Sequence, residues 1–214
     1  APAAVVGFGG FASVPTVLAA RWLGLPVVLH EQNAVLGRAN RLLARYAATI
    51  ATSFAETAGV PAGDQAKTRA IGNPVRDEIA TLRDNVYRPP TGDRPVHLLI
   101  TGGSQGARVF ADILPPALAA LPAALRARLR VAQQARQEDV ARVTAAYRTS
   151  GIDAEVSSFF GDIARRLAAA HLLICRAGAS TMAEIAAAGR PAVLVPYPHA
   201  MDNHQSANAC AAAE

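Results

Sequence analysis

The sequence predicts an α/β protein with two lobes, each built on a parallel β-sheet. Short apolar segments alternate with longer helical patterns along nearly all of the 214 residues. This is the order of elements in parallel sheets with right-handed crossovers. Several apolar segments are unbroken, as expected for strands that are covered on both faces. The alternation stops at residues 79–95, where Pro89, Pro90, Gly92 and Pro95 stand among mixed charges in a composition typical of a linker.

The alternation gives the following elements in order. We expect strands at Ala4–Gly7, Pro26–His30, Ala48–Thr52, Lys67–Ile71, Val96–Thr101, Leu129–Gln133, Ala154–Ser158, His171–Cys175 and Ala192–Pro196. We expect helices at Val14–Leu23, Arg38–Tyr46, Ala107–Leu121, Gln137–Thr149, Asp162–Ala169, Thr181–Ala188 and Asn203–Ala213. Residues 1–78 then form the second half of an N-terminal lobe, residues 79–95 the linker, and residues 96–214 a C-terminal lobe. Because the chain enters a strand at once and ends inside a helical pattern, we expect a piece of a longer protein, with the first lobe incomplete and the second truncated at its end.

Composition excludes several classes of protein. Hydrophobic residues make up 51% of the chain, which excludes disorder. The net charge is +5 without a block of like charge, so nucleic acid is not an expected partner, whereas phosphate-bearing ligands or an anionic membrane face suit the arginine-rich surface. Cys175 and Cys210 make no disulfide framework, and no Cys/His spacing resembles a metal site. Glycines and Pro15 break the uncharged stretch 3–20, which argues against a membrane span, so we expect a cytoplasmic protein. We expect neither a metal nor a cofactor.

Two turns in the second lobe are suited to anions. Residues 177–184 follow a strand with small residues and open a helix, where Ser180 and Thr181 could cap the helix and its dipole would favour a pyrophosphate. Glu184 follows about one helical turn later, where a carboxylate could bind a sugar diol. Residues 101–108 form a second strand–turn–helix segment with Ser104 in the turn. This turn lacks the lysine of a Walker loop, which argues against an ATP-hydrolysing P-loop. Two anion-receptive turns in one lobe fit a nucleotide diphosphate better than a dinucleotide.

A third glycine-rich turn, at residues 7–12, leaves an alternative open. It fits G-x-G-x-x-A, and Glu31 ends the next strand, as in dinucleotide-binding proteins. The alternative is an NAD-binding oxidoreductase lobe, and a purely structural turn is at least as consistent with this short pattern.

Polar residues follow the second strand as His30-Glu31-Gln32-Asn33. His30 or Glu31 could transfer a proton, and Asn33 could hydrogen-bond a sugar, bridge the lobes or form an Asx-turn. The arginines of the next helix share one face, which is either solvated or, near exposed aromatic residues, in contact with anionic lipid. That helix carries Arg38, Arg41 and Arg45, and the aromatic residues are Phe8, Phe11 and Trp22.

Four further residues are candidates for ligand contacts. Arg76, after the turn Gly72-Asn73-Pro74, could reach a phosphate or be an ordinary surface arginine. Phe160 could form a wall for a base, with its backbone reading the base edge, or pack in the core. Gln205 and Asn208 are about one helical turn apart, and paired amides that face a cleft could read sugar hydroxyls.

The motifs taken together resemble the MurG family over essentially the whole chain. In order they read G-F-G-G-F, H-E-Q-N, G-N-P-V-R, G-G-S-Q-G-A, C-R-A-G-A-S-T-M-A-E-I-A-A-A-G-R-P-A and a final H-x-x-x-x-x-Q-x-x-N-A. Members of that family transfer N-acetylglucosamine (GlcNAc) from UDP-GlcNAc to lipid I, the undecaprenyl-pyrophosphoryl-muramyl-pentapeptide, and so make lipid II for peptidoglycan, cell-wall biogenesis, cell division and cell shape. The resemblance implies a GT-B-like fold of two Rossmann-like lobes.

The resemblance also implies roles for individual residues. Glu184 would hold the ribose, Gln205 and Asn208 the GlcNAc hydroxyls, and Ser104 with Thr181 the pyrophosphate. The remaining donor-binding positions would be Asn33, Arg76, the backbone at Phe160, Ala179, Ser180, Met182 and Ala183. The turn at residues 7–11 and the region of His30 and Glu31 would face the acceptor.

Three features depart from the family or qualify its implications. The family's N-terminal glycine-rich loop, whose histidine is proposed as general base, and its C-terminal helix are absent, and His204 stands where members often carry glutamine. The implied partners are UDP-GlcNAc, lipid I and the anionic cytoplasmic face of the bacterial plasma membrane, where the protein would be peripheral. A non-catalytic nucleotide-sugar binder remains a second alternative.

Overall fold

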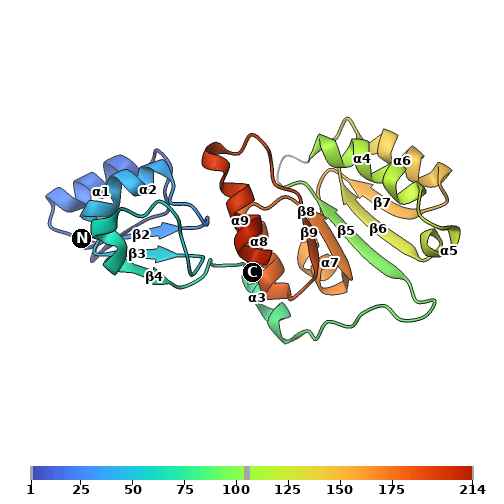
Figure 1. Ribbon diagram of the computed structural model, residues 1–214, viewed down its shortest axis with the longest axis horizontal. Helices are drawn as coiled ribbons and strands as arrows, with labels where there is room; N and C mark the ends of the chain where they lie inside the picture. Colours follow the sequence, from blue (N-terminus) through green and yellow to red (C-terminus); the bar gives the residue numbers. More distant parts are fainter. Residues whose placement is uncertain (1, 104–106, 214) are drawn as a thin grey trace. The chain divides into compact units, whose positions relative to one another are not determined.

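The chain folds into two parallel β-sheets with helices, as the alternation predicts. The structure is a computed structural model that describes residues 2–103 and 107–213. By its internal contacts the chain divides into two compact units (Figure 1). The first unit comprises Ala1–Pro74, Ala177–Ala183 and Pro196–Glu214, and the second comprises Val75–Arg176 and Glu184–Val195. The predicted limits of the two lobes stay a prediction.

Every predicted strand is confirmed, with small differences at the ends. In the first unit the strand order is β1 (Val5–Gly7), β2 (Val27–Glu31), β3 (Thr49–Thr52) and β4 (Thr68–Ala70), all parallel. In the second unit the order is β7 (Asp153–Ser157), β6 (Leu129–Gln134), β5 (Val96–Thr101), β8 (Leu172–Cys175) and β9 (Ala192–Leu194), again all parallel. The chain order reverses between β5 and β8, which makes this pair a topological switch point.

Helix α1 (Ser13–Trp22) packs against the first sheet through a close approach at Gly7. A Cβ at Gly7 would lie 3.1 Å from Leu29 and 3.2 Å from Val17, so only glycine fits without a shift of these side chains. The segment then continues through α2 (Arg38–Leu43) and two 3₁₀ turns, Ala44–Tyr46 and Ala62–Lys67. Their apolar residues form one core with β2 and β3, in which Leu29, Leu43 and Ile50 are fully buried.

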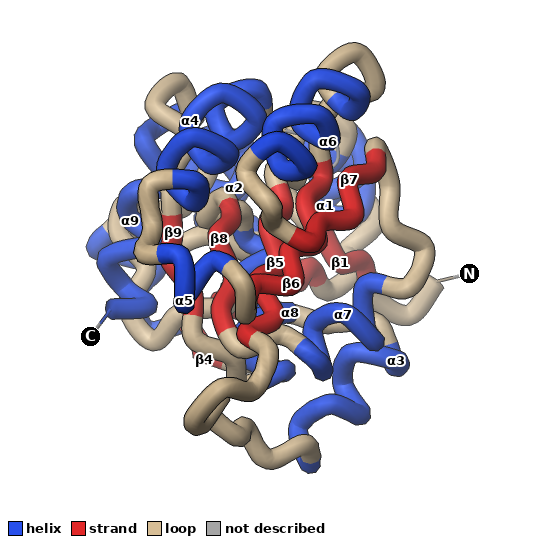
Figure 2. The backbone as a smooth tube through the Cα atoms, turned by 90° about the vertical axis from the view of Figure 1, so that its right-hand side faces the viewer, coloured by secondary structure: helices blue, strands red, loops and turns tan. Residues whose placement is uncertain are grey.

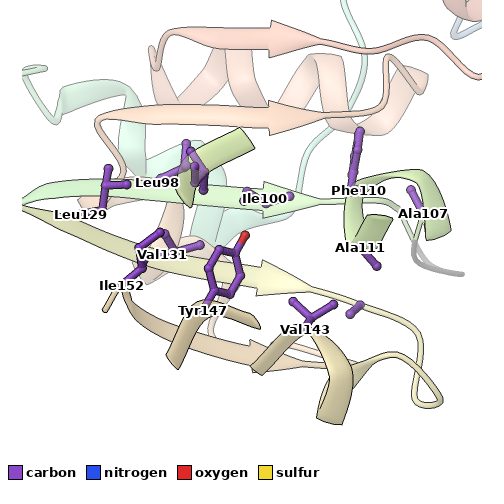
Figure 3. Packing of buried hydrophobic residues seen from close by; sticks show 12 residues of the cluster. Leu98, Ile100, Ala107, Phe110, Ala111, Leu129, Val131, Val143, Tyr147 and Ile152 are labelled. Carbon is purple, nitrogen blue, oxygen red and sulfur yellow. The ribbon is translucent and has the colours of Figure 1, made fainter. Parts of the chain in front are cut away.

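The second sheet has a core on each face. Helices α4 (Arg108–Ala119) and α6 (Val140–Thr149) lie side by side on one face (Figure 2). Figure 3 shows Val143 and Tyr147 of α6 beside β6, and Phe110 of α4 belongs to the same cluster of buried residues. The other core joins residues of β5 and β8 with residues of α7 (Ile163–Ala169) and α8 (Ala179–Ala188). A short helix, α5 (Ala123–Arg126), precedes β6, and the chain ends in α9 (His204–Ala213), after the 3₁₀ turn Met201–Asn203.

Two details of local structure differ from the prediction. The start of the predicted linker at residue 79 lies within α3 (Asp77–Ala80), which a 3₁₀ turn (Thr81–Asp84) follows, and Ile79 and Leu82 are buried in one core with residues of β5 and β8. Helix α8 begins at Ala179 rather than at Thr181. Within the part of the chain that the structure describes, no helix is long and apolar enough to cross a membrane.

Candidate functional site

The two predicted anion turns leave the second sheet side by side. Thr101, the last residue of β5, is paired with Cys175, the last residue of β8. Both strands run in the same direction and are neighbours at the switch point, so the two turns that follow begin at the same edge of the sheet. Ser104 lies outside the described residues, so its predicted contact with a pyrophosphate stays a prediction.

The start of α8 differs from the predicted cap. The amide of Met182 donates to the carbonyl oxygen of Gly178 at 2.9 Å, and the helix begins at Ala179, so Ser180 and Thr181 lie within the first turn. The first amides of an α-helix have no acceptor within the helix, and together with the helix dipole they favour an anion. The turn therefore offers backbone N–H groups, with the hydroxyls of Ser180 and Thr181 beside them. Met182, by contrast, is buried.

Arg76 and Glu184, which the sequence places 108 residues apart, meet in the second unit. Nη2 of Arg76 lies 3.2 Å from Oε1 of Glu184, and Nη1 lies 3.2 Å from Oε1 of Glu78. The Arg76 side chain is 56% exposed and the Glu184 side chain 24%. A cation and an acceptor that could contact a phosphate and a diol are thus held close together and open to solvent.

Phe160 is buried, which favours the core-packing interpretation of its ring. Only 7% of the residue is exposed, and the guanidinium of Arg166 lies 4.0 Å from the centre of the ring. Arg166 is itself fixed by Glu155 at 2.8 Å and by Asp162 at 2.7 Å. Arg165 and Arg166 together lower the pKa of Asp162 to about 2. The predicted contact of the Phe160 backbone with a base stays a prediction.

A cavity of about 500 Å³ opens in the first unit beside the H-E-Q-N loop. Its wall consists of residues 8–11, residues 31–33, the start of α2 and Met201. The wall is largely apolar, with the carboxylate of Glu31 as its acidic group and Arg38 as its basic group. The glycine-rich turn at residues 8–11 and the His30–Asn33 loop, both predicted to face an acceptor, are therefore brought together.

The carboxylate of Glu31 organises this loop. It accepts hydrogen bonds from the backbone N–H of Gly37 (2.9 Å) and of Asn33 (3.1 Å), and from the side-chain amides of Asn33 (3.2 Å) and Asn40 (2.9 Å). Only 3% of Glu31 is exposed. Both oxygens of the carboxylate are therefore already used as acceptors within the loop. This geometry favours a role in shaping the loop over that of a freely accessible base.

His30 is also held by neighbours on both ring nitrogens. Its Nε2 lies 3.0 Å from the carbonyl oxygen of Gly72, and its Nδ1 lies 3.0 Å from Nε2 of Gln32. A carbonyl only accepts and the Gln32 amide donates, so Nε2 of His30 carries the proton. His30 thus links the loop to the turn before Pro74. The predicted proton transfer by His30 or Glu31 stays a prediction.

Gln205 and Asn208 do not form an open pair of amides. Oε1 of Gln205 accepts the backbone N–H of Tyr197 at 2.9 Å. Asn208 is fully buried, accepts the backbone N–H of Ala34, and donates to Asn33 and to the carbonyl oxygen of Ala177. The amide of Asn208 is therefore already used within the chain, and the predicted contact with a sugar hydroxyl stays a prediction.

Two further contacts were not predicted. Asn40 is 1% exposed and donates to the carbonyl oxygen of His30 and to Glu31. Its position between the buried residues Leu36 and Leu43 on the inner face of α2 is the sequence signal that could have revealed it. Arg38 pairs with Asp202 at 3.0 Å, and the hydrogen bond with Arg38 lowers the pKa of Asp202. Asp202 has a φ of 53°, which is uncommon for a residue other than glycine.

Comparison with protein families decides the family of the chain. A model of the glycosyltransferase family 28 C-terminal domain matches residues 97–214, and a model of the family's N-terminal domain matches residues 1–52. The chain belongs to glycosyltransferase family 28.

Curated relatives resemble the chain along nearly its whole length. A protein of Paramagnetospirillum magneticum is 57% identical over 211 residues, which are 99% of this chain and 57% of that protein. One of Rhodospirillum rubrum is 59% identical over 208 residues, 97% of this chain and 53% of that protein. Both are named UDP-N-acetylglucosamine–N-acetylmuramyl-(pentapeptide) pyrophosphoryl-undecaprenol N-acetylglucosamine transferase. The chain thus spans little more than half the length of these relatives.

Solved structures agree with the family 28 assignment. The crystal structure of Acinetobacter baumannii MurG matches with a TM-score of 0.78 and 38% identity, over 98% of this chain and 57% of that one. The predicted resemblance to MurG and the predicted GT-B-like fold with Rossmann-like parallel sheets are therefore confirmed. The oxidoreductase alternative, which depended on one glycine-rich turn, gains no support from these relatives.

Proposed function

We propose that the chain is part of an inverting glycosyltransferase that moves GlcNAc from UDP-GlcNAc to the muramyl 4-hydroxyl of lipid I and forms lipid II. The observation that carries this proposal is the 57% and 59% identity, over nearly the whole chain, to relatives named for this transfer. The pairing of Thr101 with Cys175 supports it, since two anion-receptive turns begin together at the switch point.

The donor would bind at the start of α8. Its first-turn amides, with Ser180 and Thr181, would hold the pyrophosphate, and Glu184 would accept hydrogen bonds from the ribose hydroxyls. Negative charge grows on the leaving UDP during transfer. Each well-placed N–H donor or cation, such as Arg76, would stabilise that charge by about 3 kcal/mol. Gln205 would contribute a contact with GlcNAc, and Asn33 would lie between the donor site and the acceptor site.

The acceptor would bind at the cavity of the first unit. The muramyl 4-hydroxyl must lose its proton as it attacks the anomeric carbon, and a positioned base accelerates such a step by about 10²–10⁴-fold. His30 and Glu31 are our candidates within this chain. Nδ1 of His30 already accepts from Gln32, and the carboxylate of Glu31 already accepts from Gly37, so either residue would act as a base only if such a bond opened when the acceptor enters.

We also propose peripheral attachment to the anionic cytoplasmic face of the plasma membrane, where lipid I would be met. Phe11 is 90% exposed and Trp22 is 89% exposed, and α1 and α2 lie side by side in the first unit (Figure 1). Helix α2 adds exposed arginines to these aromatic residues. This combination is typical of surfaces that rest on anionic lipid.

The test combines ligand binding with transfer. The chain is titrated with UDP-GlcNAc, and the complete protein that contains it is incubated with labelled UDP-GlcNAc and lipid I. We expect binding and labelled lipid II. Binding without transfer in the complete protein would favour a non-catalytic nucleotide-sugar binder, and binding of neither UDP-GlcNAc nor UDP would overturn the proposal.

A further inference from the structure

Asn208 joins three segments that are distant in the sequence. Its Oδ1 accepts the backbone N–H of Ala34 at 2.8 Å, and its Nδ2 donates to Oδ1 of Asn33 at 3.1 Å and to the carbonyl oxygen of Ala177 at 2.9 Å. The residue is fully buried, and all these atoms belong to the first unit. The two hydrogens of its amide nitrogen are thus each used once, and its oxygen is used as well.

The orientation of the Asn208 amide is fixed by its neighbours. The backbone N–H of Ala34 needs an acceptor and the carbonyl of Ala177 needs a donor, so only one of the two amide orientations satisfies both. Asn33 imposes the same choice, because its Nδ2 donates to Oε1 of Glu31 and leaves its Oδ1 to accept from Asn208. An unbroken hydrogen-bonded chain therefore runs from Glu31 through Asn33 and Asn208 to Ala177.

This chain of hydrogen bonds connects two predicted parts of the site. Glu31 and Asn33 form part of the wall of the cavity in which the acceptor would bind. Ala177 lies two residues before α8, whose first turn would hold the donor diphosphate. A substitution of Asn208 would therefore alter both the wall of this cavity and the segment before α8, although Asn208 is shielded from solvent.

We propose that Asn208 is a positioning residue, which sets the segment before α8 relative to the His30–Asn33 loop and contacts neither substrate. It acts through Asn33, Ala34 and Ala177. The proposal rests on the proposed function, since it names what is being positioned. It differs from the role that the sequence motif suggests, in which Asn208 hydrogen-bonds the GlcNAc hydroxyls directly.

Two substitutions separate the hydrogen bonds of Asn208. In Asn208→Asp a carboxylate oxygen still accepts the N–H of Ala34, but both donations are lost and oxygen faces oxygen at Asn33 and Ala177. In Asn208→Leu all three hydrogen bonds are lost at similar volume. Cys210→Ala, at an exposed position on the same helix, is the matched control.

The first measurement is calorimetric titration of each variant with UDP and with UDP-GlcNAc. A positioning residue acts on the diphosphate site, so both ligands should bind about tenfold more weakly to Asn208→Asp, by the same factor for each. Weakening confined to UDP-GlcNAc would show a direct sugar contact and overturn the proposal. A lowered unfolding temperature with unchanged affinities would show a merely structural role and would overturn it equally.

The second measurement needs no ligand, so it tests the positioning role of Asn208 independently of the proposed function. Amide hydrogen exchange should be faster across residues 176–183 in both Asn208 variants, while the amide of Ala34 should lose protection in Asn208→Leu and keep it in Asn208→Asp. Unchanged exchange at residues 176–183 in both variants would overturn the proposal. If the unchanged protein bound neither UDP nor UDP-GlcNAc, the proposed function would fail, and this exchange pattern would still decide whether Asn208 positions the segment.

Discussion

The guanidinium of Arg76 lies 3.2 Å from the carboxylate of Glu184, so two residues predicted separately as donor contacts are each other's partners. With Arg76 56% exposed, the pair contributes at most about 1 kcal/mol to stability. Its significance is instead geometric, because it holds a cation next to the carboxylate proposed to bind the ribose. Ligand binding and protein stability should therefore respond differently to changes at these positions.

Replacing Glu184 by alanine should weaken UDP-GlcNAc binding about tenfold or more, because two ribose hydroxyls lose their acceptor. The midpoint of thermal unfolding should change little, because the ion pair is exposed on the Arg76 side. Calorimetric titration measures the affinity. The control is Glu78→Ala, which removes the other carboxylate partner of Arg76. An affinity that falls equally in both variants would mean that Arg76, rather than Glu184, carries the effect.

Replacing Glu31 by glutamine should destabilise the chain by about 2 kcal/mol or more. The new NH₂ group would face one or more of the four N–H donors that now converge on the carboxylate, and buried donors would lose their acceptor. Urea unfolding followed by circular dichroism measures the loss. Glu56→Gln, at an exposed position in the same unit, should be nearly neutral. A Glu31→Gln variant as stable as the control would contradict the account of this loop.

His171 should make the chain less stable in mild acid. Burial, followed by the nearby charges of His97 and Arg190, lowers the pKa of His171. In the unfolded chain the pKa of His171 is about 6.5, so as the pH falls the unfolded state is protonated before the folded state. The free energy of unfolding therefore decreases as the pH drops below about 6.5. Nδ1 of His171 also accepts the backbone N–H of His97 at 2.9 Å, a bond that protonation at Nδ1 would break.

The variant His171→Asn tests this pH dependence. Its amide oxygen can take the place of Nδ1 as acceptor and does not titrate. Urea unfolding at pH 7.5 and pH 5.5 should show a smaller loss of stability in the variant than in the unchanged chain. Equal losses in both proteins would assign the acid sensitivity to other groups.

The two cysteines should differ in reactivity. Burial raises the pKa of the Cys175 thiol to about 12, whereas Cys210 is exposed on α9. A thiol-specific reagent at pH 8 should modify one thiol in the native chain and two after unfolding, and none in native Cys210→Ala. As the pH rises, the Cys175 thiol ionises in the unfolded chain before it ionises in the folded chain. The free energy of unfolding therefore decreases as the pH rises above about 8.5. Rapid modification of Cys175 in the native chain would contradict its burial.

The strands could be predicted because their residues are compatible with few other secondary structures. Runs such as residues 96–101 and 171–175 are apolar, short and bounded by turn residues, and parallel sheets bury such runs on both faces. Residues 77–84 could not be assigned in the same way, because the prolines and glycine that follow obscure two apolar residues. Ile79 and Leu82 are helical because they pack on the second sheet, and that contact is not encoded locally.

The sequence indicates candidate positions for the site. Glycine turns and polar strand ends make residues 30–33, 76 and 179–184 candidates, because ligands of parallel α/β sheets bind at the carboxyl ends of the strands, and their contacts with a ligand stay a prediction. The start of α8 was misplaced because Ser180 and Thr181 have strong capping preferences, while Gly178, a weaker cap, precedes the helix. The burial of Asn208 could not be foreseen, because α9 is rich in alanine and lacks an apolar stripe that would mark its inner face.

Titration of the chain with UDP-GlcNAc and, separately, with NAD tests the central claim most directly. If the two turns that begin beside Thr101 and Cys175 form a site for a uridine diphosphate sugar, UDP-GlcNAc binds with measurable heat and NAD does not. Binding of NAD in place of UDP-GlcNAc would contradict the claim and restore the oxidoreductase reading of the first glycine-rich turn.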